Sequence, residues 1–368
     1  MKKLALALIG IFVISACGDD DDSGSGDLIP TTPKAYIGIE GTSPNGISSL
    51  AEYNTTNQSI ENNVFRKANI NPMGSQLSDI MYDADQNQFV LLVPGSNKII
   101  YIDANSLVIK RQIKDLMQVR KVAKVSDFLY YVSSPELGGI YVINAIKGNI
   151  RSEIEIDGIT NPTEIKVWED MAFICNTGSP ITRDSTVTIM RTTEDTIISH
   201  LMVGHSPNSM VIDEENQLWI MCSGEFNATS PLTSGVGSLW TYNLDSLKMA
   251  VDSGLAIMPD TVRYFQDNQL RPGHLTYDES GKNLYYITGA PTGSISSFNK
   301  AQRRVSETPL ISGNFYGLNF DDRNLELYGM RTPMDIEEDG FLEVFDPVGN
   351  VKVSIRIGVK PVDVVFKQ

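Results

Sequence analysis

The feature that most constrains this chain is a repeat of short apolar runs. Seven runs recur about every 48 residues, namely AYIGI (35–39), FVLLV (89–93), FLYYV (128–132), MAFIC (171–175), LWIMC (218–222), LYYI (284–287) and LELYG (325–329). Each is followed by a second strand-like run such as NKIIYIDAN (97–105), and then by an amphipathic run such as NIRSEIE (149–155). Alternation of apolar and polar residues is typical of a half-exposed outer strand.

A fourth run precedes each cycle. These runs are SQLSDIMYD (75–83), QVRKVAKV (118–125), NPTEIKVWE (161–169), HSPNSMVID (205–213), RPGHLTYDE (271–279), NFYGLNFDD (314–322) and KPVDVVFKQ (360–368). Four strands in a repeat of roughly 40–50 residues are typical of a β-propeller blade. The sequence therefore predicts an all-β fold for residues 34–368, a seven-bladed β-propeller with four-stranded blades.

The two ends of the repeat region complement each other. It begins on the second strand of a quartet, at residue 35, and ends on a first strand. The C-terminal strand is therefore expected to join the N-terminal blade and close the ring, which removes the open sheet edges. A pair of β-sandwiches is the rival architecture, but it does not predict seven matched quartets with complementary ends.

The first 17 residues, MKKLALALIGIFVISAC, read as an export signal. Two lysines precede an apolar stretch of 11 residues, which is too short to span a bilayer as a helix. A cysteine directly after Ile-Ser-Ala resembles the lipobox of bacterial lipoproteins, which implies removal of residues 1–16 and lipidation of Cys17. The alternative is an ordinary signal peptide in which the cysteine is incidental.

Residues 17–33 form the predicted linker, which contains the acidic run GDDDDSGSGD (18–27). Its composition is typical of a flexible, solvated segment. An acidic run after a lipidated cysteine resembles the surface-export signal of Bacteroidota lipoproteins, so display on the outer face of the outer membrane is expected. The alternative is a simple tether. The formal net charge of −15 argues against a nucleic-acid partner, because phosphate binding needs a basic surface.

Three segments resemble the repeats of YncE-like propellers. They are PGSNKIIYIDANSLVIKRQI (94–113), GITNPTEIKVWEDMAFICNTG (158–178) and VGHSPNSMVIDEENQLWIMCSG (203–224). The resemblance covers residues 35–368 and is specific for the fold. Its Bacteroidota branch includes surface lipoproteins that capture scarce nutrients for a TonB-dependent outer-membrane transporter. The resemblance therefore implies a small-molecule ligand that is cobalamin-like or siderophore-like.

Catalytic and metal-binding motifs are missing from the sequence. It has three histidines, and no HExxH, P-loop or G-x-S-x-G pattern. His205 and His274 begin two first strands but lack an obvious third metal ligand. The acidic segment DADQN (83–87) resembles the start of a calcium loop, yet Gln88 and Pro94 replace the required Gly and Glu. We therefore expect solvated hairpin turns, no enzyme activity, no metal and no cofactor. Cys175 and Cys222 are expected to be free, buried thiols with poor geometry for a bridge.

The ligand is expected on the face that carries the two longest connections, 223–237 and 253–270. Aromatic residues in them exceed what a solvated loop needs, although they could simply pack the loops together. Side chains at the entries to the first strands would form the channel mouth and hold an anionic or oxygen-rich ligand, or else satisfy backbone carbonyls and water. The candidate ligand-binding residues are Arg120, Asn161, His205, Asn208, Phe226, Tyr264, Phe265, Arg271, Tyr316 and Lys360.

The leading hypothesis is a surface lipoprotein that binds a corrinoid or an iron–siderophore and passes it to a TonB-dependent transporter. Two alternatives stay open. The propeller could be a non-catalytic platform for protein partners in an outer-membrane assembly or a glycan-handling complex. An enzyme would need an acid–base or metal constellation in the channel that the sequence does not supply.

Overall fold

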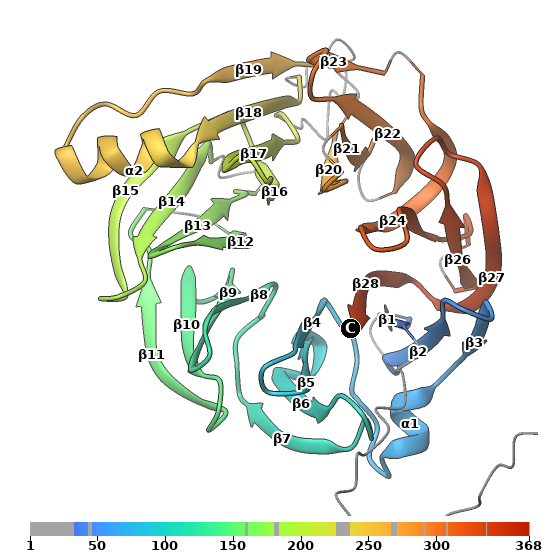
Figure 1. Cartoon of the computed structure of the whole chain (residues 1–368). Coiled ribbons are helices and arrows are strands. Elements are labelled where there is room, and N and C mark those ends of the chain that lie inside the picture. Colours follow the sequence, from blue (N-terminus) through green and yellow to red (C-terminus); the bar gives the residue numbers. More distant parts are fainter. Residues whose placement is uncertain are drawn as a thin grey trace, which may run out of the picture. The chain divides into compact units, whose positions relative to one another are not determined.

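The computed structural model describes residues 33–42, 46–158, 161–179, 184–225, 236–265, 271–280, 282–289, 292–306, 308–335 and 337–367. Their strands form antiparallel sheets within one unit, Thr32–Gln368. Figure 1 shows these sheets arranged around a central axis, with one strand of each near the axis and another at the rim. The fold is an all-β propeller with four-stranded blades, as predicted.

Five sheets have four strands each. The first comprises β28 (Pro361–Lys367), β1 (Lys34–Ile39), β2 (Ser49–Asn54) and β3 (Ser59–Glu61). The second comprises β4 (Asp79–Asp83), β5 (Gln88–Val93), β6 (Lys98–Asp103) and β7 (Ile109–Lys114). The third comprises β8 (Val122–Ser126), β9 (Leu129–Ser134), β10 (Gly139–Asn144) and β11 (Asn149–Glu155). The fourth comprises β12 (Pro162–Trp168), β13 (Met171–Asn176), β14 (Thr186–Arg191) and β15 (Thr196–Met202). The fifth comprises β16 (Pro207–Ile212), β17 (Gln217–Cys222), β18 (Ser238–Asn243) and β19 (Thr261–Tyr264).

The remaining strands form one eight-stranded sheet. The structure therefore has five separate four-stranded blades, and the expected number of seven separate blades is corrected. Its members are β20 (Gly273–Tyr277), β21 (Asn283–Ile287), β22 (Gly293–Asn299), β23 (Arg304–Val305), β24 (Ile311–Asp321), β25 (Glu326–Arg331), β26 (Asp339–Phe345) and β27 (Val351–Val359). The reason lies in β24, an 11-residue strand whose first part pairs with β22 and whose later part pairs with β25. No break separates the two quartets there.

The two ends of the repeat region pair with each other, as the sequence predicts. β1 and β28 run antiparallel with Ala35 opposite Phe366 and Ile37 opposite Val364. The innermost strands also contact one another in order, from β4 through β8, β12, β16, β20 and β24 to β28, and β28 contacts β4.

Burial explains which runs become which strands. The second strand of a sheet is packed on both faces, so runs such as QFVLLV in β5 and MAFICN in β13 are buried throughout. Outer strands have one solvated face, and β11 accordingly alternates between exposed and half-buried residues. The acidic segments are hairpin turns, because the Oδ1 atoms of Asp83, Asp213 and Asp321 accept hydrogen bonds from backbone N–H groups two residues on.

Within the residues that the structure describes, the helical elements are few and short. They are α1 (Val64–Ala68), the 3-10 turn η1 (Pro94–Ser96) and α2 (Leu244–Ser253). The Asn243 side chain accepts a hydrogen bond from the Ser246 N–H to cap α2, and Gly254 ends it at φ +64°. Within the described ranges, no helix is long and apolar enough to cross a membrane.

The two cysteines are free and buried, as expected. Both belong to one hydrophobic cluster between the fourth and fifth sheets, although they end the matching runs MAFIC and LWIMC of successive repeats. In the fourth sheet the proline that begins the inner strand, Pro162, lies opposite Asn176. In the fifth sheet the equivalent proline, Pro207, lies opposite Cys222. The registers therefore differ by one residue, and a shift of one residue reverses the face to which a side chain points.

Candidate functional site

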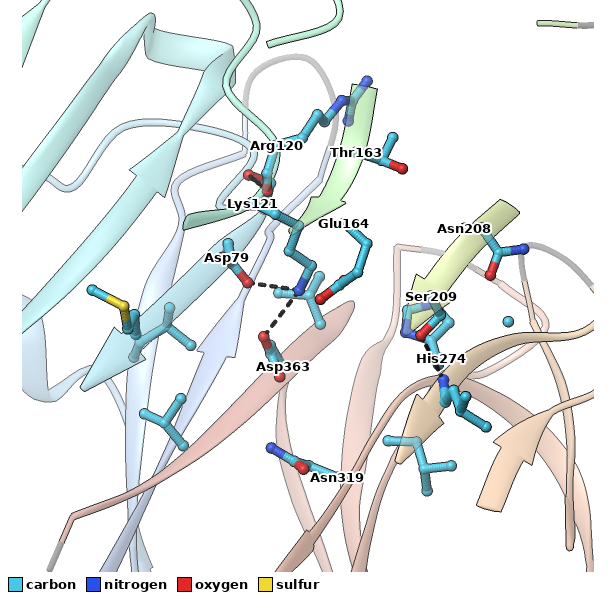
Figure 2. Close-up of a pocket in the computed structure, with 18 of the residues that line it drawn as sticks. Asp79, Arg120, Lys121, Thr163, Glu164, Asn208, Ser209, His274, Asn319 and Asp363 are labelled. Carbon is cyan, nitrogen blue, oxygen red and sulfur yellow. Dashed lines mark hydrogen bonds and ion pairs between the residues drawn. The ribbon is translucent and has the colours of Figure 1, made fainter. Parts of the chain in front are cut away.

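The described structure contains a central channel of about 1250 Å³. Its wall is built from the innermost strands β4, β8, β12, β16, β20, β24 and β28, together with the residues that lead into them (Figure 2). A site in this channel therefore receives side chains from every sheet.

The middle of the channel holds a charged network (Figure 2). Lys121 Nζ lies 2.6 Å from Asp79 Oδ1 and 3.4 Å from Asp363 Oδ2, and the Val122 N–H donates to Asp79 Oδ2 at 2.9 Å. Burial, opposed by Lys121 and reinforced by the nearby Asp363, raises the pKa of Asp79 to about 7. Glu164 also lines the channel and pairs with Lys166 at 3.1 Å.

These interior residues share one position in the repeat that sequence reasoning missed. Glu164, Ser209, His274 and Asp363 each stand two residues after a proline that begins or directly precedes an inner strand. The runs quoted in the sequence contain this Pro-x-polar pattern four times. An aligned set of polar residues on strands that face the axis is the signal that could have found them.

The channel mouth brings together five of the predicted ligand-binding residues. Those that line the channel are Arg120, Asn161, Asn208, Arg271 and Tyr316. Four of them come from the entries to, or the first residues of, the successive inner strands β8, β12, β16 and β20, and Tyr316 lies in the middle of β24. The structure thus places these five residues in the lining of one channel. Their role in ligand binding remains a prediction.

Hydrogen bonds orient three of these side chains. Asn161 Nδ2 donates to the Gly178 carbonyl at 2.8 Å, and the Tyr316 hydroxyl donates to Glu40 at 3.0 Å. Asn208 Nδ2 donates to the Pro272 carbonyl at 3.0 Å, whereas its buried Oδ1 has no hydrogen-bond partner in the described structure. An acceptor without a donor is costly to bury, so this oxygen is an unsatisfied polar atom in the channel wall.

Two predicted residues lie near the mouth but outside the channel lining. His205 Nδ1 is 2.7 Å from the Ser185 hydroxyl, and Lys360 Nζ is 3.8 Å from Glu40. Both side chains thus engage protein groups rather than the channel.

Two of the three aromatic residues predicted to bind the ligand lie outside the channel lining. Tyr264 ends the outermost strand β19 and is 64% exposed, away from the channel lining. Phe265 is buried and packs against Tyr286 with ring centroids 5.5 Å apart. The reason is that β19 (Thr261–Tyr264) lies inside the predicted loop 253–270 and pairs with β18, so this segment is not one long connection. Phe226 lies outside the described residues, and so does Cys17.

His274 differs from the other groups in the channel. Its imidazole is accessible from the channel and makes no hydrogen bond or ion pair with the described residues. Desolvation inside the channel, and then the charge on Lys121, lower its pKa below the ordinary value, which favours the neutral ring. The described part of the chain has no group of three or more His, Cys, Asp or Glu residues that could hold a metal ion.

Comparison with known proteins supports the fold alone. No protein-family model matches the chain, and no curated protein sequence matches it. Among solved structures, a quinoprotein alcohol dehydrogenase-like protein from Bacteroides thetaiotaomicron is similar, with a TM-score of 0.67 and 13% identity over 91% of this chain and 78% of that one. A protein of unknown function from Desulfotomaculum acetoxidans has a TM-score of 0.61 and 11% identity over 90% and 98% of the two chains. Hydrazine synthase from Kuenenia stuttgartiensis has a TM-score of 0.58 and 16% identity over 73% and 76%.

Proposed function

We propose that this protein is a non-catalytic binding propeller whose ligand site is the mouth of the central channel. The observation that carries the proposal is the convergence of polar side chains from five successive inner strands on a cavity of about 1250 Å³. Cavities of this size accommodate bulky small molecules. The propeller fold is consistent with a binding protein or a platform, and fold alone does not choose between them.

The chemistry of the mouth favours an oxygen-rich or anionic ligand. Arg120 and Arg271 supply guanidinium groups, which form strong, directional hydrogen bonds to carboxylates and phosphates. Corrinoids and iron–siderophores both carry many such oxygens and amides.

The wider proposal is a YncE-like surface lipoprotein that passes a corrinoid or an iron–siderophore to a TonB-dependent outer-membrane transporter. Its support is the lipobox-like sequence ending at Cys17, the acidic run 18–27 and the resemblance of three repeat segments. Substitution of Cys17 by Ala should abolish lipid attachment and release the protein from the outer membrane. Unchanged membrane association of that variant would contradict the anchor.

Calorimetric titration tests the binding site. The purified protein is titrated with aquocobalamin and, separately, with ferric enterobactin, and one of them should bind. The double variant Arg120→Ala/Arg271→Ala should weaken that binding about tenfold or more, which corresponds to about 1.4 kcal/mol. Arg151→Ala is the matched control, because Arg151 is 61% exposed on the outer strand β11 and lies 3.9 Å from Asp195. Binding of neither ligand, or equal loss in the control, would overturn the proposal.

A platform for a protein partner is the second candidate, and one observation favours it. Met249, Leu255 and Met258, on and just after α2, are each at least two-thirds exposed. Contiguous exposed apolar side chains are typical of protein contact surfaces, and we infer that these three residues form such a patch. Met258→Glu should then abolish co-purification with an outer-membrane partner while leaving ligand titrations unchanged.

We also propose that the eight-stranded sheet represents two blades joined along β24, so that the ring contains seven. The support is that Tyr285 and Ile287 of one half pack in one cluster with Phe320, Leu327 and Phe345 of the other half. Stacked halves behave as neighbouring blades. The pairing of β1 with β28 supports closure of that ring.

A further inference from the structure

The fifth sheet departs from the repeat between its last two strands. In the fourth sheet residues 192–195 join β14 to β15 as a turn, whereas in the fifth residues 244–260 join β18 to β19 and contain the helix α2. Figure 1 shows α2 at the rim of the propeller, followed by the return of the chain to β19. Insertions into single repeats of such folds often form the surface that a partner contacts.

One face of this insertion belongs to the core. Leu244 and Leu247 are buried in the cluster between the fourth and fifth sheets, and Val251 and Ile257 pack against the same cluster. Burial of these apolar side chains fixes the helix and the segment after it on the propeller. The insertion therefore presents its other face to solvent as an ordered surface.

The solvent face carries apolar side chains that lie close together. The N–H groups of Gly254 and Leu255 donate to carbonyls of the last helical turn, Leu255 to Ala250 at 2.8 Å. In this Schellman motif the residue after the glycine contacts the side chains of that turn, which places Leu255 beside Met249. Met249 and Leu255 are each 67% exposed, and Met258 is 76% exposed. We call these three residues the α2 patch.

Two cations beside the α2 patch are already held in ion pairs. Lys248 Nζ lies 2.5 Å from Asp170 Oδ1. Arg191 lies 2.5 Å from Asp170 Oδ2 and 2.6 Å from Asp252 Oδ1. The charges of the lysine and the arginine are thus balanced by the two aspartates.

Further carboxylates leave this surface with excess negative charge. Asp245 lies on α2 itself and accepts a hydrogen bond from Asn216 Nδ2 at 3.3 Å. Glu215 precedes Asn216, and Glu169 precedes the Asp170 that pairs with the helix. Asp245, Glu215 and Glu169 are exposed, and none of them forms an ion pair with the described residues. The apolar patch therefore has an acidic border.

We propose that the α2 patch docks a segment of another protein that carries both apolar and basic side chains. The apolar side chains cover Met249, Leu255 and Met258, and the lysines or arginines meet the acidic border. Charge complementarity favours this partner. A second copy of this chain would bring the same carboxylates together across the interface, and an anionic lipid surface would meet them with like charge. Methionine side chains suit such a surface, because they are flexible and adapt to the shape of a partner.

This inference rests on the platform, the second candidate of the proposed function, and deepens it by naming the chemistry of the partner. It does not depend on a ligand in the channel.

Fluorescence anisotropy with two labelled model peptides tests the docking. One peptide is an amphipathic helix of leucine and lysine, and the other has glutamate at every lysine position. The lysine peptide should bind the purified protein, and the glutamate peptide should not. Raising the salt concentration from about 0.05 M to about 0.5 M should weaken the binding several-fold, because salt screens the carboxylates.

Three variants locate the binding surface. Met249→Ser/Met258→Ser removes apolar contact and should weaken binding of the lysine peptide about tenfold. Glu169→Gln/Glu215→Gln should weaken it less and reduce its dependence on salt. Met334→Ser is the matched control, because Met334 is 93% exposed in the connection between β25 and β26, and it should behave as wild type. The substituted side chains are all exposed, so the variants should fold, which circular dichroism checks.

The outcomes separate this inference from the proposed function. Failure of the lysine peptide to bind, equal binding of both peptides, or binding that survives Met249→Ser/Met258→Ser overturns the docking of a basic segment. A dimer in analytical ultracentrifugation that this variant dissociates also overturns it, as does binding to phosphatidylglycerol vesicles that the variant abolishes. If the lysine peptide fails while Met258→Glu still prevents co-purification with an outer-membrane partner, the platform stands and only the basic character of its partner is overturned. Ligand titrations of the channel test the binding site separately.

Discussion

Two lysine–aspartate centres in this molecule look alike and lie in different surroundings. Lys300 Nζ is 2.8 Å from Asp213 Oδ2 and 3.0 Å from Glu214, in the turn between β16 and β17. Lys121 Nζ is 2.6 Å from Asp79 and 3.4 Å from Asp363, in the channel. The side chains of Lys300 and Asp213 are 9% and 1% exposed, whereas that of Lys121 is 34% exposed.

The two aspartates differ in the direction in which their surroundings shift the pKa. Asp213 also accepts hydrogen bonds from the Trp219 ring and from the backbone N–H of Gln217. Burial alone would raise its pKa, but Lys300 and these donors lower it, so the native protein favours the carboxylate. At Asp79, burial and the neighbouring Asp363 prevail over Lys121 and raise the pKa. The turn is a satisfied structural centre, and the channel retains excess carboxylate.

Removing the ion pair between Lys300 and Asp213 should have the largest effect on stability. Lys300→Met leaves Asp213 buried without its ionic partner, so it should reduce the free energy of unfolding by about 3 kcal/mol at pH 7. Urea denaturation measures the change. Lys147→Met removes an exposed lysine and should change the stability by less than about 0.5 kcal/mol. A loss for Lys300→Met no larger than that of this control would show that the buried pair does not stabilise the turn.

Breaking the channel centre should give a smaller effect that depends on pH. Lys121→Met leaves Asp79 and Asp363 facing each other, but water in the channel can solvate them, so a loss of about 1–2 kcal/mol is expected at pH 8. A carboxyl whose pKa is raised in the native state binds protons more tightly there, and its stabilising effect is lost as pH rises from about 4 through 7. The loss should therefore shrink at pH 5. Urea denaturation at both pH values is the measurement, and a loss that grows at pH 5 would refute this assignment.

The sequence predicts these two centres to different extents. Periodic apolar runs identify the strands and the pairing of the chain ends, because burial on both faces demands such runs. The acidic turns are recognised for a similar local reason, since Asp213 caps its own hairpin. The interior of the channel is formed by residues far apart in the chain, such as Lys121 and Asp363. No local sequence pattern predicts their contact.

Two local departures also escaped prediction. The fusion at β24 follows from one strand that continues from a rim position to an axial one, and the run NFYGLNFDD reveals only the second part. The helix α2 was not predicted, although its cap at Asn243 and its end at Gly254 follow ordinary rules. A repeat of four strands does not indicate a helix between β18 and β19.

The smallest expected effect concerns His274, whose unpaired ring lies in the same channel as Lys121. Its native pKa is lowered, so below about pH 6.5 the unfolded chain binds a proton that the native ring resists. Wild-type stability should therefore fall as pH decreases through that range, and His274→Asn, which keeps a residue tolerant of positive φ, should remove this part of the loss. Relative to wild type, the variant should gain up to about 1 kcal/mol between pH 7.5 and pH 5, because channel water limits the effect. Parallel urea denaturation of both proteins measures it, with His200→Asn on the exposed outer strand β15 as the control. If the difference in the free energy of unfolding between wild type and His274→Asn does not change with pH, the imidazole binds a proton as readily in the native protein as in the unfolded chain. The contrast between this ring and the ion pair at Lys300 would then rest on geometry alone.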